Sequence, residues 1–214
     1  MTRLLLILST IFLAFTAGAK DSELSYIQRL GDPLDTMHNE RLYLSAIEQA
    51  LTHDNIPKGE KMRLEIMAQS ARKNAEGTPA ADITFITPDN AEHHLTDYRG
   101  RLTLIFFNDP DCESCSLVKK RIADSAELST LVRDKKLIIV GIYPFDDEEL
   151  WRETEYPTHI VNGWDKNHEI DGNETYELPH FPIFYLLSPD GIVITKNEPS
   201  LRRIISRIAA ITAE

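Results

Sequence analysis

The chain has 214 residues, and its 34 Asp and Glu residues against 23 Lys and Arg residues give a formal net charge of -11 at pH 7. A surface this acidic repels nucleic acid and anionic lipid, so neither is expected as a partner. The length is sufficient for one domain with an extension.

The N-terminal segment has the layout of a secretory signal peptide. Arg3 precedes an apolar run from Leu4 to Phe15, and small residues follow as far as Ala19, before Lys20. The apolar run is short for a membrane span. We therefore predict a cleavable signal peptide over residues 1–19 and a protein that is periplasmic or otherwise exported. An uncleaved, membrane-anchored form is the alternative.

Residues 20–78 are predicted to form a helical N-terminal region. Apolar residues recur at helical spacing in two segments, with the turn sequence HDNIPKGE between them. These apolar residues are Leu44, Ile47 and Leu51, then Leu64, Met67, Ala68 and Ala71. The sequence AEGTPAAD at residues 75–82 is typical of a hinge, so a second domain is predicted over residues 79–214.

From residue 83 onward the pattern becomes that of β-strands alternating with helices. The predicted strands are residues 83–87, 102–107, 137–143, 183–187 and 192–196. The helical pattern between the second and third strands is long enough for a parallel crossover. The turn sequence SPDG between the last two predicts an antiparallel hairpin, and a closing helix follows Pro199.

The segment 144–180 has the weakest pattern. We interpret DDEELWRET as a short helix and WDKNHEIDGNETYELPH as mostly loop. The order of elements predicts an α/β fold, a mixed sheet with flanking helices, preceded by the small helical region.

The chain contains two cysteines, Cys112 and Cys115, between a predicted strand and a predicted helix. At a helix N-terminus the unpaired N–H groups and the helix dipole favour a thiolate on Cys112. Cys115 is one turn further along, partly shielded and close enough to form a disulfide with Cys112. An exposed nucleophile backed by a buried resolving thiol is the arrangement that thiol–disulfide exchange requires.

Other readings of the cysteine pair lack support in the sequence. A structural zinc site needs four ligands, and the histidines of the chain do not have the spacing to complete one, so no metal is predicted. A structural disulfide closing so short a loop would constrain the unfolded chain little. A structural disulfide nevertheless remains an alternative to redox chemistry. No cofactor is expected for the redox function.

The sequence resembles the thioredoxin-like, TlpA-like family of exported thiol–disulfide oxidoreductases over about residues 80–212. The run ADITFITPDNAEHHLTDYRGRLTLIFFNDPDCESC carries this resemblance, together with FPIFYLLSPDGIVI. Its turn residues are Leu95, Asp97, Tyr98, Gly100 and Arg101. The resemblance implies that Cys112 and Cys115 are catalytic and that Pro182 is the family's cis-proline. We expect Phe181 to offer its backbone N–H and C=O to an extended substrate strand.

The chain departs from the family pattern near the cysteines. Phe106 occupies the position of the buried aspartate of thioredoxin, which leaves the proton route to the second cysteine open. Asp109, Asp111 and Glu113 oppose the helix dipole, so a thiolate on Cys112 is less stable and the pair should be reducing.

Two classes of function follow from these observations. The first is an enzyme that reduces or isomerises disulfides of other exported proteins and is itself reduced by an electron-donating membrane protein. The second is a thioredoxin-fold binding module or metal-handling chaperone without redox turnover. The C-x-x-C spacing counts against the copper chaperones of this fold, which have C-x-x-x-C.

Overall fold

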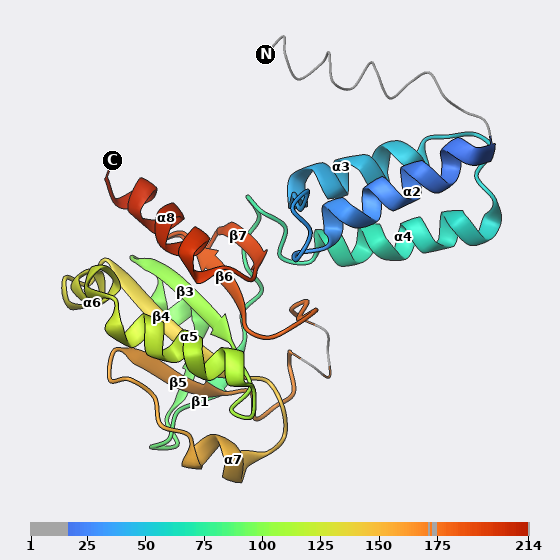
Figure 1. Cartoon of the computed structure of the whole chain (residues 1–214). Helices are drawn as coiled ribbons and strands as arrows, with labels where there is room; N and C mark the ends of the chain where they lie inside the picture. The colour runs from blue at the N-terminus through green and yellow to red at the C-terminus, as the bar shows by residue number, and fades with distance from the viewer. Residues whose placement is uncertain (1–16, 171, 173–174, 214) are drawn as a thin grey trace. The chain divides into compact units, whose positions relative to one another are not determined.

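The computed structural model describes residues 17–170, 172 and 175–213 (Figure 1). Residues 1–16 of the predicted signal peptide lie outside the described residues. The chain divides into two compact units, the first ending at Ala68 and the second beginning at Gln69. The division falls within a helix and precedes the predicted boundary between residues 78 and 79.

The first unit is helical, as predicted. It contains α2 (Ala17–Gly31), α3 (Glu40–Leu51) and the first part of α4 (Lys58–Arg72). Its core is made by apolar residues from each helix, namely Ile27, Leu30, Ile47, Ala50, Leu64 and Ala68. Asn39 caps α3, because its side-chain oxygen accepts a hydrogen bond of 3.0 Å from the N–H of Leu42.

The second unit contains a seven-stranded mixed sheet in the order β2-β1-β5-β4-β3-β6-β7. The strands are β1 (Thr84–Ile86), β2 (Glu92–His94), β3 (Leu102–Phe107), β4 (Leu137–Tyr143), β5 (Ile160–Trp164), β6 (Ile183–Leu187) and β7 (Val193–Glu198). Strands β3, β4 and β5 are parallel, whereas β6 and β7 pair antiparallel. The predicted α/β fold, crossover and hairpin are confirmed.

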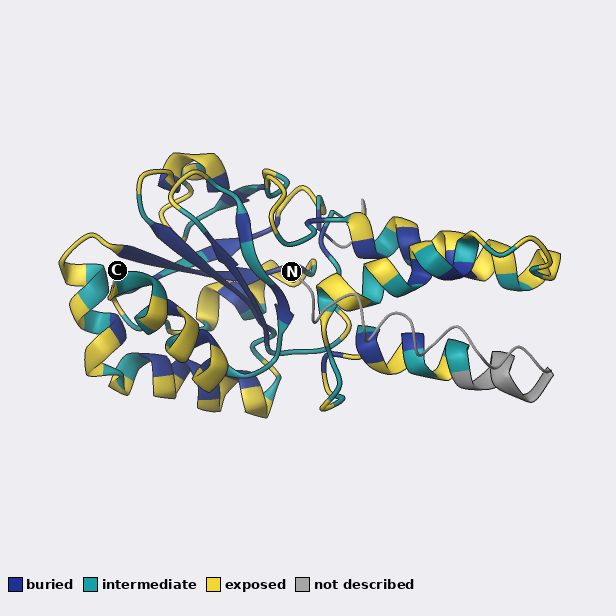
Figure 2. Cartoon of the chain, turned by 90° about the horizontal axis from the view of Figure 1, so that it is seen from above, coloured by how far each residue is buried: buried dark blue, intermediate teal, exposed yellow. Residues whose placement is uncertain are grey.

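The central strands are buried on both faces, as the dark blue ribbons of Figure 2 show. One face packs against α5 (Glu113–Asp124), α6 (Ala126–Arg133) and α8 (Leu201–Thr212). The other face packs against Ile170 and Tyr176 of the segment before β6 and against the 3-10 helix Leu95–Tyr98. The continuous apolar sequence of β3 and β4 follows from this burial.

Strands β2 and β5 were not predicted. The sequence of β5, IVNGW, contains Asn162 and Gly163, which have low strand propensity. It becomes a strand because it pairs in parallel with β4, with Val140 opposite Val161. The short helix predicted at DDEELWRET is present as α7 (Glu148–Glu153), capped by Asp147.

Candidate active site

The two cysteines lie where β3 passes into α5, at the N-terminal end of the helix. Cys112 is the N-cap residue, with an extended backbone, and its Sγ atom accepts a hydrogen bond of 3.1 Å from the N–H of Cys115. The sulfur therefore meets one of the N–H groups that a helix leaves unpaired at its start. The Oγ atom of Ser114 is also 3.1 Å from this sulfur.

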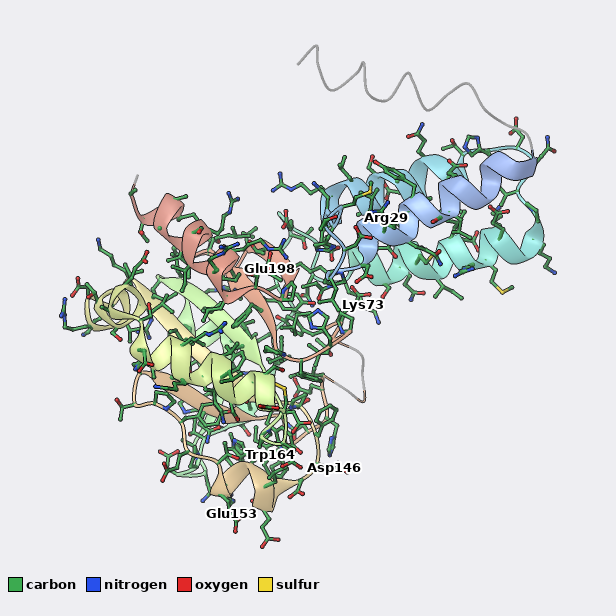
Figure 3. All side chains as sticks on the ribbon, in the orientation of Figure 1. Arg29, Lys73, Asp146, Glu153, Trp164 and Glu198 are labelled. Atoms are coloured by element: carbon green, nitrogen blue, oxygen red, sulfur yellow. A yellow bond between two sulfur atoms is a disulfide. The ribbon has the colours of Figure 1, made fainter. Side chains whose placement is uncertain are left out.

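Cys112 and Cys115 are joined by a disulfide, and their Cα atoms are 5.2 Å apart. Figure 3 shows the described side chains as sticks on the ribbon, with Asp146 and Trp164 labelled near α7. The two cysteines differ in exposure. Cys115 is fully buried, whereas Cys112 is partly exposed. Cys112 is therefore the more accessible of the two sulfurs, and the predicted order of attack and resolution stays a prediction.

The strand that leads into the site is apolar where thioredoxin has its buried acid. Phe106 is fully buried and stacks on Phe184, with ring centres 5.3 Å apart. The first polar side chain after it is Asn108, which is also fully buried. Its Nδ2 group donates to the backbone oxygens of Phe106 (3.1 Å) and Ile142 (3.2 Å).

Asn108 belongs to a buried polar group that the sequence did not reveal. Its Oδ1 atom accepts a hydrogen bond of 2.5 Å from the hydroxyl of Tyr156. The Nζ atom of Lys119 lies 4.7 Å from the centre of the Tyr156 ring. Burial raises the pKa of Tyr156 and lowers the pKa of Lys119. The one available signal was the spacing of Cys115 and Lys119, which share a helix face at i and i+4.

Acidic side chains surround the exposed cysteine. Asp111 and Glu113 are exposed, and Asp109 is partly exposed on the same loop. Burial, and then the charges of Asp109, Asp147 and Asp146, raises the pKa of Tyr143 at the end of β4. Asp109, Asp111 and Glu113 lie within three residues of Cys112 in the sequence, and their negative charges oppose a thiolate there.

The Phe181–Pro182 peptide bond is cis, as the resemblance implies. Phe107 of β3 pairs with Ile183 of the antiparallel strand β6. Continuing this pairing by one residue places Pro182 opposite Asn108. Phe181 is partly buried and packs against the cluster of buried residues that Cys112 also contacts. Its ring meets that of Phe145 edge-on, with centres 5.5 Å apart.

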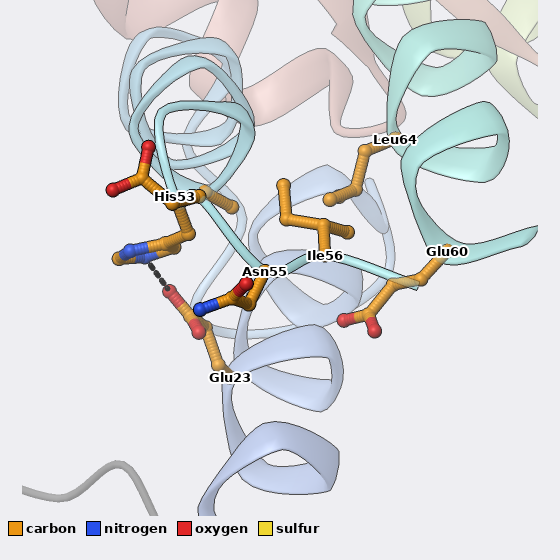
Figure 4. Close-up of a pocket in the computed structure, with 8 residues that line it drawn as sticks. Glu23, His53, Asn55, Ile56, Glu60 and Leu64 are labelled. Atoms are coloured by element: carbon orange, nitrogen blue, oxygen red, sulfur yellow. Dashed lines mark ion pairs between the residues drawn. The ribbon is translucent and has the colours of Figure 1, made fainter. Parts of the chain in front are cut away.

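A separate cavity of ≈ 340 Å³ lies within the helical unit (Figure 4). Its lining includes acidic side chains at Glu23, Asp54 and Glu60. The Nε2 atom of His53 lies 3.7 Å from Oε1 of Glu23.

Within the described part of the chain, no cluster of three or more His, Cys, Asp or Glu side chains is arranged to hold a metal ion. No helix described is both long enough and apolar enough to span a membrane.

The fold agrees with solved structures of similar proteins. A thioredoxin-like protein from Bacteroides caccae is 29% identical, with a TM-score of 0.78 over 85% of this chain. This chain spans 66% of that protein's length. The C-terminal domain of an uncharacterized protein from Bacteroides fragilis is 27% identical, with a TM-score of 0.61 over 64% of this chain and 99% of its own.

A more distant likeness extends to a thioredoxin domain of a thiol-disulfide oxidoreductase from Bacteroides vulgatus. It is 21% identical, with a TM-score of 0.52 over 64% of this chain and 97% of its own, and shows the fold alone. No family model and no curated protein matches the chain. By its fold and these likenesses, the chain has a thioredoxin-like fold with an additional N-terminal helical region.

Proposed function

We propose that the chain is an exported thiol–disulfide oxidoreductase that reduces or isomerises disulfides of other envelope proteins through Cys112 and Cys115. The observation that carries this proposal is the difference between the two sulfurs. Cys112 is partly exposed at the first turn of α5, and Cys115 is fully buried behind it. A disulfide used only as a clip needs no such asymmetry.

The reaction begins with the pair reduced. The thiolate of Cys112 attacks a sulfur of the substrate disulfide, forms a mixed disulfide and releases the first substrate thiolate. The thiolate of Cys115 then attacks Sγ of Cys112, which forms the Cys112–Cys115 disulfide and releases the second. The released thiolates take up protons. The substrate disulfide gains the two electrons that the pair loses.

The helix dipole and the N–H of Cys115 stabilise a thiolate on Cys112, and the acids around it act in the opposite direction. The disulfide form is then relatively stable, which favours a reductant. Such a protein must be reduced again after each turnover, and we assign this step to an electron-donating membrane protein. Phe181 and Pro182 are proposed to bind the substrate as an extended strand beside Cys112.

The test is turnover of a protein disulfide by residues 20–214. Insulin is incubated with this protein and dithiothreitol, and precipitation of the reduced B chain is followed over time. We expect acceleration by the wild-type protein and none by Cys112→Ser. Matched rates for the two proteins would refute the oxidoreductase proposal and favour a thioredoxin-fold binding module.

A further inference from the structure

The buried thiol of Cys115 must lose a proton before it can attack the mixed disulfide. It is fully buried, so water does not reach it directly. Strand β3 below it is apolar and carries no acid, since its sequence is LTLIFF. The base that accepts this proton therefore has to come from elsewhere in α5 or from another element packed against it.

Lys119 has the position and the environment for this role. It lies four residues after Cys115 in α5, and residues at this spacing are neighbours on one helix face. Its side chain is only 9% exposed, and no hydrogen bond or carboxylate within the described residues pairs with it. Burial without a counter-charge lowers the pKa of Lys119, which makes the neutral amine more accessible.

The amine is held in place by neighbours rather than by an ion pair. Its Nζ atom lies over the face of Tyr156, 4.7 Å from the ring centre. The hydroxyl of Tyr156 is fixed on Asn108, which is anchored to the backbone of β3 and β4. Tyr156 also packs against the cluster of buried residues that contains Cys115.

We propose that Lys119 is the proton acceptor for Cys115, and that Tyr156 and Asn108 are positioning residues that hold its amine beneath α5. The inference rests on the proposed exchange function. The neutral amine takes the thiol proton of Cys115 and becomes an ammonium. The Cys115 thiolate attacks Sγ of Cys112, the bond from Cys112 to the substrate breaks, and the departing thiolate takes a proton from the ammonium or from water.

Other charged and titratable groups lie on the elements around Lys119. They are Asp109 and Asp111 on the loop after β3, Tyr143 on β4, Glu155, Tyr156 and His159 before β5, and Cys112, Glu113 and Lys120 on or at the start of α5. Tyr156 stays neutral, because burial raises its pKa. His159 is the competing base, since its Nε2 atom lies 3.3 Å from the backbone oxygen of Ile122 in α5.

The test separates attack by Cys112 from resolution by Cys115. The reduced protein is mixed with an equimolar amount of the aromatic disulfide DTNB, and release of its coloured thiolate is followed by stopped flow across a pH series. Attack by Cys112 releases the first thiolate, and attack by Cys115 on the mixed disulfide releases the second. Each step therefore has its own rate and pH profile.

In Lys119→Met we expect an unchanged first release and a second release slowed about 100-fold near neutral pH, with its profile moved to higher pH. Lys119→Arg should be slow as well, because arginine keeps the charge and cannot accept a proton. The exposed Lys120→Met and the competing base His159→Gln are the controls, and both should follow the wild-type profile.

Tyr156→Phe serves as a second variant that keeps the ring under the amine and loses only the bond to Asn108. We expect its second release to slow less than that of Lys119→Met. Near-UV circular dichroism verifies the fold of each variant.

A wild-type profile in Lys119→Met, or full rescue by Lys119→Arg, would overturn the role of Lys119 alone. Absence of the second release in the wild type would instead overturn resolution by Cys115 and the proposed function with it.

Discussion

The N–H of Cys115 donates a hydrogen bond of 3.1 Å to Sγ of Cys112, so the buried residue of the pair stabilises the sulfur of the exposed one. The bond forms because Cys112 is the N-cap of α5 and Cys115 is in the first helical turn. The same geometry places Cys115 behind Cys112 as seen from outside. The two cysteines are therefore expected to respond differently to substitution.

Cys115→Ser should trap substrates and Cys112→Ser should not. Without Cys115 the mixed disulfide on Cys112 has no resolving thiol, whereas without Cys112 the remaining thiol is buried. The measurement is non-reducing electrophoresis of exported proteins captured on each variant, followed by release with dithiothreitol. Equal trapping by the two variants would contradict the assignment of roles.

The reduction potential of the Cys112–Cys115 pair should be low. We expect a value nearer about -270 mV, as in thioredoxin, than about -120 mV, as in a dedicated oxidant. The reason is that the nearby acids make a thiolate on Cys112 less stable and leave the disulfide relatively favoured. Equilibration in dithiothreitol or glutathione buffers measures it. A value above about -170 mV would point to an oxidase or isomerase.

Neutralising the acids beside Cys112 should raise this potential. Asp111→Asn with Glu113→Gln removes charges that oppose the thiolate, and we expect a rise of about 20 mV from exposed charges at this position. Glu127→Gln is the matched control, because Glu127 is an exposed acid in the first turn of α6, away from the cysteines. An equal rise in the control would show that net charge, not position, sets the potential.

Lys196→Met should destabilise the second unit. The Lys196 side chain is fully buried, its Nζ atom is 2.5 Å from Oε2 of Glu177, and it donates to the backbone oxygens of Ala71 (3.2 Å) and Ser70 (3.4 Å). Removing one partner leaves the other charge unpaired, so we expect a loss of about 3 kcal/mol in the free energy of unfolding. Urea unfolding measures it, and exposed Lys136→Met should change little.

Alkaline pH should destabilise the protein in a way that depends on Tyr98. Burial, and then the charge of Asp97, raises the pKa of Tyr98 to about 12 in the folded state. An unperturbed tyrosine has a pKa of about 10. The unfolded tyrosine ionises first, so stability is lost as pH rises between these values. The Tyr98→Phe variant should therefore lose less stability than the wild type over this pH range, with a difference of about 2 kcal/mol at most. Thermal unfolding of the two proteins across the range measures it. An identical alkaline loss in the two proteins would contradict this.

The sequence by itself determined the central strands and the place of the cysteine pair. The runs at residues 102–107, 137–143 and 183–187 match β3, β4 and β6 at both ends, because strands buried on both faces need continuous apolar residues. Cys112 and Cys115 follow a strand and open a helix in the linear order of the chain. Both features can be placed from local pattern, because the apolar runs and the position of the cysteines are visible in the linear sequence.

Only the tertiary structure decided which polar residues are buried and which weak segments become strands. The sequence does not distinguish buried Lys119 and Lys196 from solvated lysines. The β5 sequence IVNGW is short and is weakened as a strand by Asn162 and Gly163. Tyr156 and Asn108 are 48 residues apart, and they meet because β5 adds to the edge of β4 and draws the segment before it under α5. Burial and pairing depend on packing between distant segments, and the chemistry of a lysine changes when that packing removes its water.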